Sequence, residues 1–220
     1  MPTYEGLRLK VRNKLYIPLT RRWREKTLRV KEFTIISNNC WGGTVYESYN
    51  LSKQSPTVGL FFMAEDYIRF LSDLRGYLES ELEFIQPEES KWRDAPQVSG
   101  DKRFGIYPVG RLKDIELFFL HYHSQEEAKD KWERRIKRIH WDRLLVKFND
   151  QNGCTEKHVE AFTQLPFKNK VFFTCKEWNC VPKEAYTMIR QLPRHDFIMA
   201  SYEPFGKSRY LDLTAVINGL

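Results

Sequence analysis

The sequence predicts a single α/β domain in which a largely parallel sheet is flanked by helices and follows a basic N-terminal segment. Short apolar runs alternate with amphipathic stretches, which is the order of strands and helices in parallel-sheet proteins. The apolar runs, such as FTII and VGLFF, are continuous, as in strands that are buried on both faces. A length of 220 residues, 41% of them hydrophobic, is enough for one packed core. We therefore assign residues 1–31 to the N-terminal segment and residues 32–220 to an α/β domain of catalytic type.

Eight short runs rich in β-branched and aromatic residues are predicted to be strands, because these residue types favour the pleated, buried surface of a sheet. The predicted strands are Phe33–Ser37, Thr57–Phe62, Leu82–Ile85, Phe104–Tyr107, Ile115–His123, Leu144–Phe148, Val171–Cys175 and Asp196–Ala200.

Amphipathic periodicity predicts helices between several of these strands. The clearest helix follows Ser124, where SQEE is a capping box whose first and last side chains, Ser124 and Glu127, bond to each other's backbone amides. The polar stretch Gln86–Lys102 contains two prolines and is predicted to be a long loop, of the kind that forms a lid or a substrate edge. The predicted helices are Thr44–Leu51, Ala64–Glu81, Gln125–Trp141 and Thr155–Gln164, with Lys183–Gln191 as a further candidate.

The basic charge is concentrated at the N-terminus. Residues 1–31 hold ten Lys or Arg and only two Glu, whereas the whole chain has a net charge of +7, so the rest is close to neutral. A neutral domain argues against a nucleic-acid partner, which would select a basic face with stacking aromatic residues. Residues 8–31 instead suit an anionic membrane, a phosphate-bearing substrate or a partner subunit, and a solvated helix or strand face is the simpler alternative.

Neither a membrane span nor a signal peptide is expected. No apolar run approaches the roughly 18 residues of a spanning helix, and residues 1–14 lack the apolar core of a signal peptide. We therefore expect a cytoplasmic protein, held at the inner face of the membrane if the basic segment binds lipid, with mostly reduced cysteines.

The segment Ser37-Asn38-Asn39-Cys40 follows the first predicted core strand, and ligands of open parallel sheets bind beyond the carboxyl ends of the strands. Cys40 precedes Trp41, a glycine pair and a predicted helix, whose positive end would lower the thiol pKa and favour a nucleophile. The amides of Asn38, Asn39 and the Gly42-Gly43 pair would hold an oxyanion, and Trp41 would line the substrate site. The alternative is a small buried cysteine in a tight turn.

His121 and His123 end the long predicted strand and point to one face, so either is a candidate base for Cys40. Asp150 or Asn149, after the next strand, could orient the imidazole. Both histidines could instead be structural. No metal is expected, because Cys175 and Cys180 are five apart and no CxxC or HExxH occurs.

Arg134 and Arg135 lie in the helix that follows the histidines. They differ by about 100° in direction, so one could turn inward and clamp a donor's phosphate while the other stays in solvent. The sequence has no P-loop, GxGxxG or GxSxG motif, which counts against a nucleotide hydrolase, a classical dehydrogenase and a serine hydrolase.

Four stretches carry a family resemblance: FTIISNNCWGGTVYE, SPTVGLFFMAEDYIRFL, the run from YPVGRLKD to LLVKFND, and LPFKNKVFFT. Together they resemble a bacterial domain family of unknown function whose members are usually labelled exopolysaccharide or capsule biosynthesis proteins, and sometimes acetyltransferases. A more distant likeness is to proteins labelled papain-like cysteine peptidases, which also place an Asn-Cys pair after a first strand. A third, looser likeness is to capsule acyltransferases that bind coenzyme A.

The resemblance implies an enzyme of surface polysaccharide biosynthesis, and we expect a transferase of acyl or related groups with a Cys-His centre. The donor would be a coenzyme A thioester or a nucleotide sugar, and the acceptor a glycan or its lipid-linked precursor. Two alternatives stay open: a papain-like cysteine hydrolase with the same dyad, and a non-catalytic glycan-binding or scaffold protein.

Overall fold

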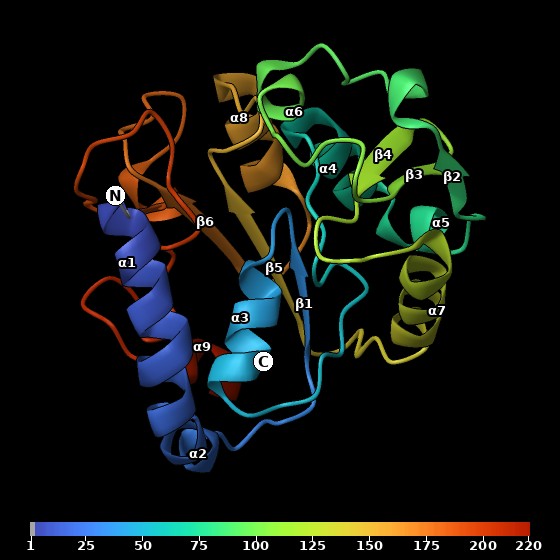
Figure 1. Cartoon of the computed structure of the whole chain (residues 1–220). Coiled ribbons are helices and arrows are strands. Elements are labelled where there is room, and N and C mark those ends of the chain that lie inside the picture. Colours follow the sequence, from blue (N-terminus) through green and yellow to red (C-terminus); the bar gives the residue numbers. More distant parts are fainter. Residues whose placement is uncertain (1–2) are drawn as a thin grey trace.

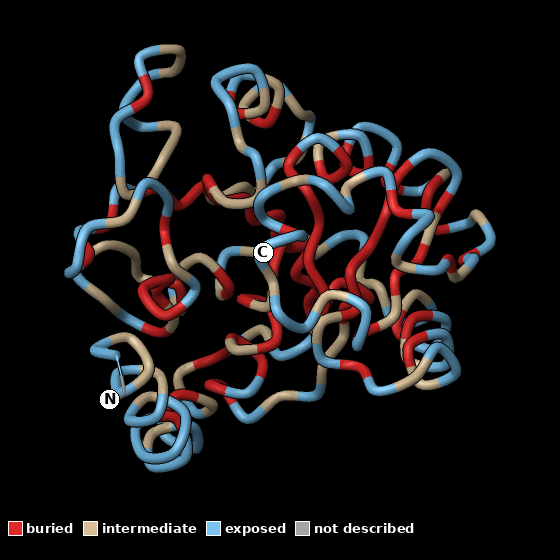
Figure 2. Tube along the Cα trace, turned by 45° about the horizontal axis from the view of Figure 1, so that its top comes forward, coloured by how far each residue is buried: buried red, intermediate tan, exposed pale blue. Residues whose placement is uncertain are grey.

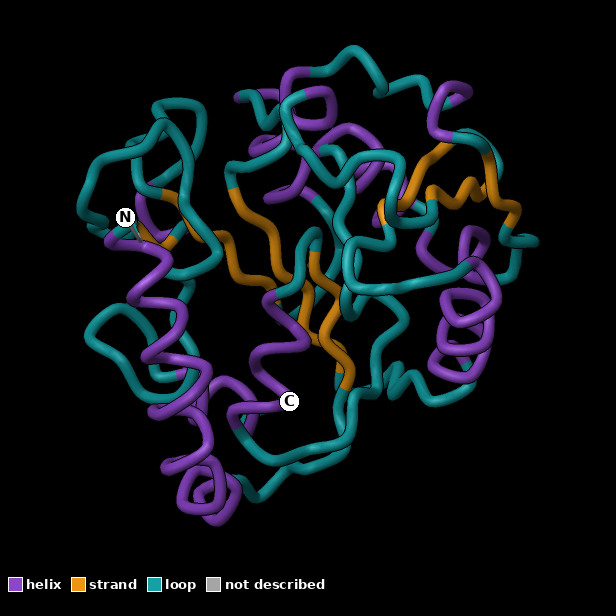
Figure 3. The backbone as a smooth tube through the Cα atoms, in the orientation of Figure 1, coloured by secondary structure: helices purple, strands orange, loops and turns teal. Residues whose placement is uncertain are grey.

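A computed structural model describes residues 3–220, so Met1 and Pro2 lie outside the described residues. Its centre is a four-stranded parallel sheet in which the strands lie side by side in the order β1, β5, β6 and β7 (Figure 1). These strands are β1 (Thr34–Ser37), β5 (Leu144–Asn149), β6 (Lys170–Thr174) and β7 (Thr187–Met188). The helices lie on both sides of this sheet (Figure 3), which confirms the predicted α/β class.

A second sheet of three antiparallel strands lies beside the first. It contains β2 (Glu83–Ile85), β3 (Val109–Leu112) and β4 (Ile115–Phe118). The prediction of one long strand from Ile115 to His123 is therefore wrong, because β4 ends at Phe118. Residues 104–107 form a turn rather than the predicted strand, and β3 begins two residues later.

The run Thr57–Phe62 was predicted to be a strand and instead connects the two sheets. Gly59, at φ +85°, interrupts the extended backbone, which is a conformation that side chains other than glycine rarely adopt. The amide of Phe61 donates to the carbonyl of Phe118 at 3.0 Å, and the amide of Phe62 donates to the carbonyl of Asn38 at 3.1 Å. The connector thus joins β4 to the end of β1.

Two apolar clusters cover the two faces of the parallel sheet. On one face Ile36, Val146, Phe148 and Phe172 pack against α4 (Ala64–Ser72), α5 (Leu74–Leu78), α7 (Gln125–Ile136) and α8 (Glu156–Gln164). On the other face Ile35, Leu145 and Phe173 pack against α3 (Trp41–Ser48) and α9 (Leu213–Asn218). β1 and nearly all of β5 are buried, whereas most of the N-terminal helix is exposed (Figure 2).

The predicted helices differ from the structure mainly at their ends. The one predicted at Ala64–Glu81 divides at Asp73, whose backbone leaves the helical region and whose carboxylate accepts from the amide of Gly76 at 3.1 Å. Ser124 caps α7 as predicted, but this helix ends at Ile136. Lys183–Gln191 is not a helix, because it holds the short 3₁₀ turn η3 (Lys183–Ala185) and β7.

The loop Gln86–Lys102 contains η2 (Pro87–Glu89) and α6 (Pro96–Ser99). Val98 is fully buried in a third cluster with residues of β3 and β4, so the loop is packed against the antiparallel sheet.

The N-terminal segment is helical, which resolves the ambiguity left by its sequence. It consists of α1 (Tyr4–Val11), the π-helical turn η1 (Arg12–Tyr16) and α2 (Ile17–Thr27), which follow one another without a loop. Its inner face packs on the domain, where the Arg8 Nε donates to the carbonyl of Ser201 at 3.2 Å and Arg12 Nη1 to that of Ala200 at 3.0 Å. Among residues 3–220, no helix is both long and apolar enough to cross a membrane.

Candidate functional site

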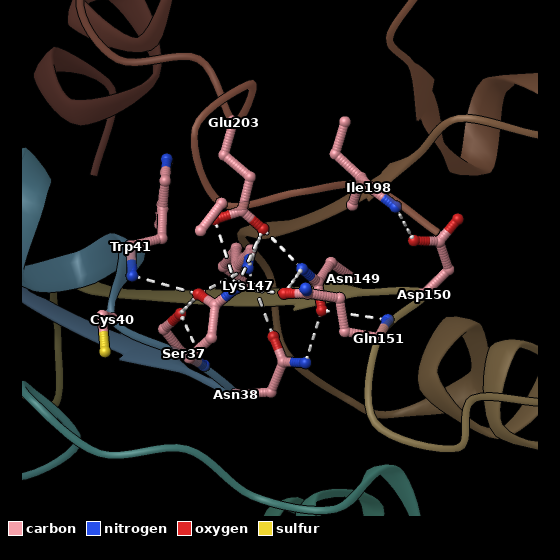
Figure 4. A network of polar contacts seen from close by, with 12 residues as sticks. Ser37, Asn38, Cys40, Trp41, Lys147, Asn149, Asp150, Gln151, Ile198 and Glu203 are labelled. Atoms are coloured by element: carbon pink, nitrogen blue, oxygen red, sulfur yellow. Dashed lines mark hydrogen bonds and ion pairs between the residues drawn. The ribbon is translucent and has the colours of Figure 1, made fainter. Parts of the chain in front are cut away.

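The candidate site lies where β1 and β5 end side by side. Ser37 pairs in register with Lys147, so the residues that follow both strands leave the sheet together. This edge is where open parallel sheets bind ligands. The side chains that gather there come from three parts of the chain: Asn38 and Asn39 after β1, Lys147 and Asn149 on β5, and Glu203 from the C-terminal segment (Figure 4).

Lys147 is the centre of this cluster. It interrupts the apolar strand LLVKFN, and its side chain is fully buried near the rings of Trp41 and Phe173. The ammonium group donates to Asn38 Oδ1 at 3.3 Å, to Asn39 Oδ1 at 2.9 Å and to Glu203 Oε1 at 2.5 Å. Burial lowers the pKa of Lys147, and Glu203 opposes this shift. All three hydrogens of the charged amine thus have acceptors.

Glu203 reaches the cluster from an irregular segment. Its Oε1 also accepts from Asn39 Nδ2 at 3.1 Å and from Asn149 Nδ2 at 2.6 Å. The amides are linked in turn, since Asn38 Nδ2 donates to Asn149 Oδ1 at 2.7 Å and Asn149 Nδ2 donates to Gln151 Oε1 at 3.0 Å. The result is a fully buried ion pair enclosed by planar amide groups, a geometry that suits recognition of hydroxyl or carbonyl oxygens.

Asp150 holds the C-terminal segment in place beside this cluster. Its Oδ1 accepts from the amide of Ile198 at 2.6 Å, and its Oδ2 accepts from Thr174 Oγ1 at 2.6 Å and from the amide of Cys175 at 3.3 Å. Burial raises the pKa of Asp150, and these hydrogen bonds oppose the rise. Because no histidine is among its partners in the described chain, its contacts are those of an anchor for residues 196–200.

A cavity of about 410 Å³ opens between the N-terminal helix and residues 201–210, and Glu203 is part of its lining. The hydroxyl of Ser201 is buried there without a hydrogen-bond partner in the described part of the chain. Burial lowers the pKa of the Arg12 guanidinium in this wall. The basic side chains that line the cavity are Arg8, Arg12, Lys207 and Arg209, and its aromatic ones are Tyr16, Tyr202, Phe205 and Tyr210. Such a lining suits an anionic ligand that carries a flat ring.

Comparison with known proteins places the chain in a family. Residues 11–218 match the domain of unknown function DUF1919. The chain belongs to the DUF1919 family. It is also 38% identical over 162 residues to an uncharacterized protein of Haemophilus influenzae, an alignment that covers 74% of this chain and 70% of that relative.

In this DUF1919 protein Cys40 directly precedes α3, as the sequence predicted, but its thiol is not activated. Burial raises the pKa of the Cys40 thiol to about 12, and the negative charge of Glu203 adds to the rise. The expectation that the helix would lower this pKa is therefore wrong. The increase caused by desolvation of the thiolate is larger than any decrease caused by the positive end of α3. Figure 4 shows the sulfur pointing away from the polar cluster, and its nearest acceptor is the carbonyl of Leu60 at 3.9 Å.

The two histidines do not share a sheet with Cys40. Both follow β4 of the antiparallel sheet, so the expectation that parallel strands would bring them to one edge is wrong. His121 and His123 have exposed side chains, and within residues 3–220 no hydrogen bond joins either imidazole to Cys40. Partial desolvation of the imidazole, with the positive charges of Arg103 and Lys53, lowers the pKa of His121 although the residue is exposed on the surface. The catalytic roles assigned to Cys40 and the histidines stay predictions.

The two arginines of α7 separate as their spacing suggested. Arg134 is exposed and lies 3.5 Å from Asp130. Arg135 is buried and donates to the carbonyl of Val58 at 3.2 Å and to the hydroxyl of Tyr122 at 2.6 Å. Arg135 therefore fixes the connector between the two sheets in this structure.

Trp41, Gly42 and Gly43 pack α3 on the sheet and hold the C-terminal segment in place. A Cβ on Gly42 would lie 3.3 Å from Ile35 of β1, and one on Gly43 would lie 3.1 Å from Val58 of the connector, so the pair allows α3 to approach both closely. Trp41 donates from Nε1 to the carbonyl of Pro204 at 2.8 Å and so supports the segment that carries Glu203. Among the described residues, no three His, Cys, Asp or Glu side chains gather where a metal ion could bind.

Lys147 and Glu203 are not among the site residues predicted from the sequence. A lysine within an otherwise apolar strand was the available signal for Lys147, because an unpaired charge there would be too costly to bury. No local pattern marks Glu203, which lies 56 residues further along the chain.

Proposed function

We propose that this protein is an enzyme of surface polysaccharide biosynthesis that transfers an acyl or related group to a glycan or its lipid-linked precursor, with its centre at Lys147 and Glu203. The observation that carries the proposal is the buried ion pair at the carboxyl edge of the sheet, enclosed by amides and bordering a cationic cavity. The polysaccharide context rests on the family resemblance of the sequence.

In transfer to a sugar hydroxyl the new bond forms as the donor's thioester or glycosyl–phosphate bond breaks and coenzyme A or the nucleoside diphosphate leaves, and the step requires a base that takes the hydroxyl proton. In this proposal Glu203 is that base: the residue is part of the cavity lining, and its carboxylate, which is fully buried against Lys147, must be uncovered before an acceptor can reach it. Lys147 and Asn149 position its carboxylate through hydrogen bonds of 2.5 and 2.6 Å. Asn39, which donates to the same carboxylate, would bind the acceptor oxygen once the ion pair opens.

The cavity is the proposed donor site. Coenzyme A thioesters and nucleotide sugars both carry a pyrophosphate and an aromatic base, which match the basic and aromatic side chains of the lining. The basic residues that line the cavity would thus bind the donor phosphates in place of Arg134 and Arg135, which belong to α7 and are not part of the lining.

Polysaccharide production in the host strain tests the centre. Glu203→Gln keeps the size of the side chain and removes its charge, so production is expected to fall by about 100-fold or more. Cys40→Ser is the matched control, and its production should match that of the parent. Comparable melting temperatures of the purified variants show that both are folded. Normal production by a folded Glu203→Gln variant, or its loss in Cys40→Ser alone, would overturn the proposed centre in favour of the cysteine.

Thermal unfolding in the presence of acetyl coenzyme A or a uridine diphosphate sugar tests the donor site. A donor at 100 times its dissociation constant is expected to stabilise the protein by about 2.7 kcal/mol. Arg12→Gln should reduce this effect, whereas Arg134→Gln, on an exposed residue of α7, should leave it unchanged.

A non-catalytic glycan-binding protein is the second candidate. It is favoured by the saturation of the cluster, because every hydrogen of the Lys147 ammonium already has an acceptor. Glycan binding that persists in Glu203→Gln, without transfer by the parent protein, would select this candidate. The hydrolase alternative is weakened by the raised pKa of the Cys40 thiol.

A further inference from the structure

The outer face of the N-terminal helix carries a stripe of exposed apolar side chains. We define the apolar stripe as Leu7, Val11, Leu15, Leu19 and Trp23, which lie four residues apart and are 48% to 79% exposed. Leu19 and Trp23 are the most exposed of the five, at 79% and 67%. Large apolar side chains are often exposed singly, but five at four-residue intervals along one helix, of which Val11 and Trp23 also border cavities against the domain, are the kind of arrangement that marks an interaction surface.

The π-helical turn explains why residues at this spacing stay on one side. In an α-helix a step of four residues turns about 40° beyond a full turn, so a long series would wind onto the inner face. The turn η1 has more residues per turn and lies at the middle of the stripe, between Val11 and Leu19. The π-helical turn therefore offsets the rotation of the side chains around the helix axis, and the stripe residues before and after it remain exposed.

The basic residues of the same helix form two groups, one that bonds to the domain and one that is exposed to solvent. Three arginines of the inner face bind the protein: Arg8 and Arg12 donate to backbone carbonyls of residues 200–201, and buried Arg24 donates to that of Ser48. The other basic side chains are exposed, and no carboxylate of residues 3–220 lies within 4.0 Å of them. These exposed cations are Lys10, Lys14, Arg21, Arg22 and Lys26.

We propose that the apolar stripe and these exposed cations bind the surface of an anionic lipid membrane, with the helix lying in the plane of the interface. An apolar face beside unpaired Lys and Arg matches the two layers of such a surface, the acyl boundary and the charged headgroups. Trp23 is the type of residue that settles at this boundary. The proposal rests on exposure and charge alone and is independent of the proposed reaction.

Charge complementarity favours lipid over a second copy of the chain. A symmetric dimer through the apolar stripe would place the same patch of each copy against the other. The five unpaired cations of each helix would then approach those of its partner, which is destabilising. An anionic bilayer neutralises the same cations as the stripe is buried.

Sedimentation with vesicles tests the proposal. The full-length protein is mixed with vesicles of phosphatidylcholine alone or with 30% phosphatidylglycerol at about physiological salt. Binding is expected only to the anionic vesicles, with a blue shift of tryptophan fluorescence that is lost in Trp23→Phe. Leu19→Glu should weaken binding by at least about tenfold, since it places a charge in the buried stripe. Ile106→Glu, at a 74% exposed apolar residue outside the stripe, is the matched control and should bind as the parent does.

The charged part is tested separately. Binding to the anionic vesicles should weaken by about fivefold in each of the variants Lys10→Gln, Lys14→Gln and Lys26→Gln. Lys137→Gln, at the C-terminal end of α7, should bind as the parent does. Equal binding to both vesicle types, or absence of binding by a folded parent protein, would overturn the proposal. A concentration-dependent dimer that Leu19→Glu abolishes, without vesicle binding, would overturn it in favour of a second copy.

Discussion

Lys147 shows how one residue can define a site and still be hidden in the sequence. An isolated buried ammonium group would be very costly, so its place on a core strand requires partners. Asn38 and Asn39, which follow β1, and Glu203, from the irregular C-terminal segment, supply them. Burial makes the charged form of Lys147 unfavourable in free energy, and it lowers the pKa of the amine for the same reason. Shifted pKa values are typical of groups at functional sites.

The reactivity of Cys40 gives a test at the same scale. With a pKa of about 12, about one thiol in ten thousand is ionised at pH 8, compared with about a quarter for an ordinary thiol. Alkylation of Cys40 by iodoacetamide at pH 8 should therefore be at least about 100-fold slower than that of glutathione, and it should accelerate as the pH rises towards 12. Peptide mass spectrometry after timed labelling gives the rate.

Unfolding in urea is the control for this test, because it should restore ordinary reactivity at Cys40. A native rate at pH 7 that equals or exceeds that of glutathione would show an activated thiolate, and the nucleophilic role expected from the sequence would regain support.

At the scale of elements, the connector between the two sheets depends on Gly59. A Cβ there would lie 2.9 Å from the Tyr122 ring, whose hydroxyl donates to the carbonyl of Val58 and accepts from Arg135. Gly59→Ala is expected to lower the free energy of unfolding by about 2–4 kcal/mol, since strain at positive φ and overpacking add. Gly105→Ala is the control: its φ is +90° but its Cβ would meet nothing within 4 Å, so a loss of about 1 kcal/mol is expected. Urea denaturation measures both, and equal losses would contradict the clash with Tyr122.

Elements formed by local sequence patterns could be predicted, whereas elements that depend on contacts between distant segments could not. Burial on both faces marked β1, β5 and β6, and a local capping box marked the start of α7. The connector containing Gly59 was misassigned because its apolar side chains are buried between the sheets, and burial alone looks like a strand. The antiparallel sheet was not predicted, because the register between β3 and β4 is set by a hairpin at Lys113, which has φ +52°. The sequence there lacks the glycine or asparagine that usually marks such a turn.

At the scale of the whole molecule, only part of the candidate site was predictable. Asn38 and Asn39 were found from their place after a core strand, because topology alone brings strand ends together. Glu203 could not be found, since its position depends on contacts between distant segments, including Trp41 with Pro204 and Asp150 with Ile198.

The N-terminal helix links the proposed lipid surface to the candidate site. Its outer face carries the apolar stripe, while Arg8 and Arg12 on its inner face hold the carbonyls of residues 201 and 200, next to Glu203. Replacing both arginines with glutamine should therefore loosen this segment without unfolding the sheet. Hydrogen exchange should rise by about tenfold or more in peptides covering residues 198–206 and stay unchanged in β5, since local opening requires little of the core to be disrupted.

Arg134→Gln, on α7, with Arg138→Gln, in the turn that follows it, is the matched control on exposed residues and should leave exchange at residues 198–206 unchanged. If the inner-face variant exchanges like the parent, the segment carrying Glu203 is held by Trp41 and Asp150 alone, and the helix has no mechanical connection to the site. If exchange rises as expected, a surface that binds lipid and a segment that carries the proposed base share one helix. Lipid binding at the outer face can then alter the site through the two arginines.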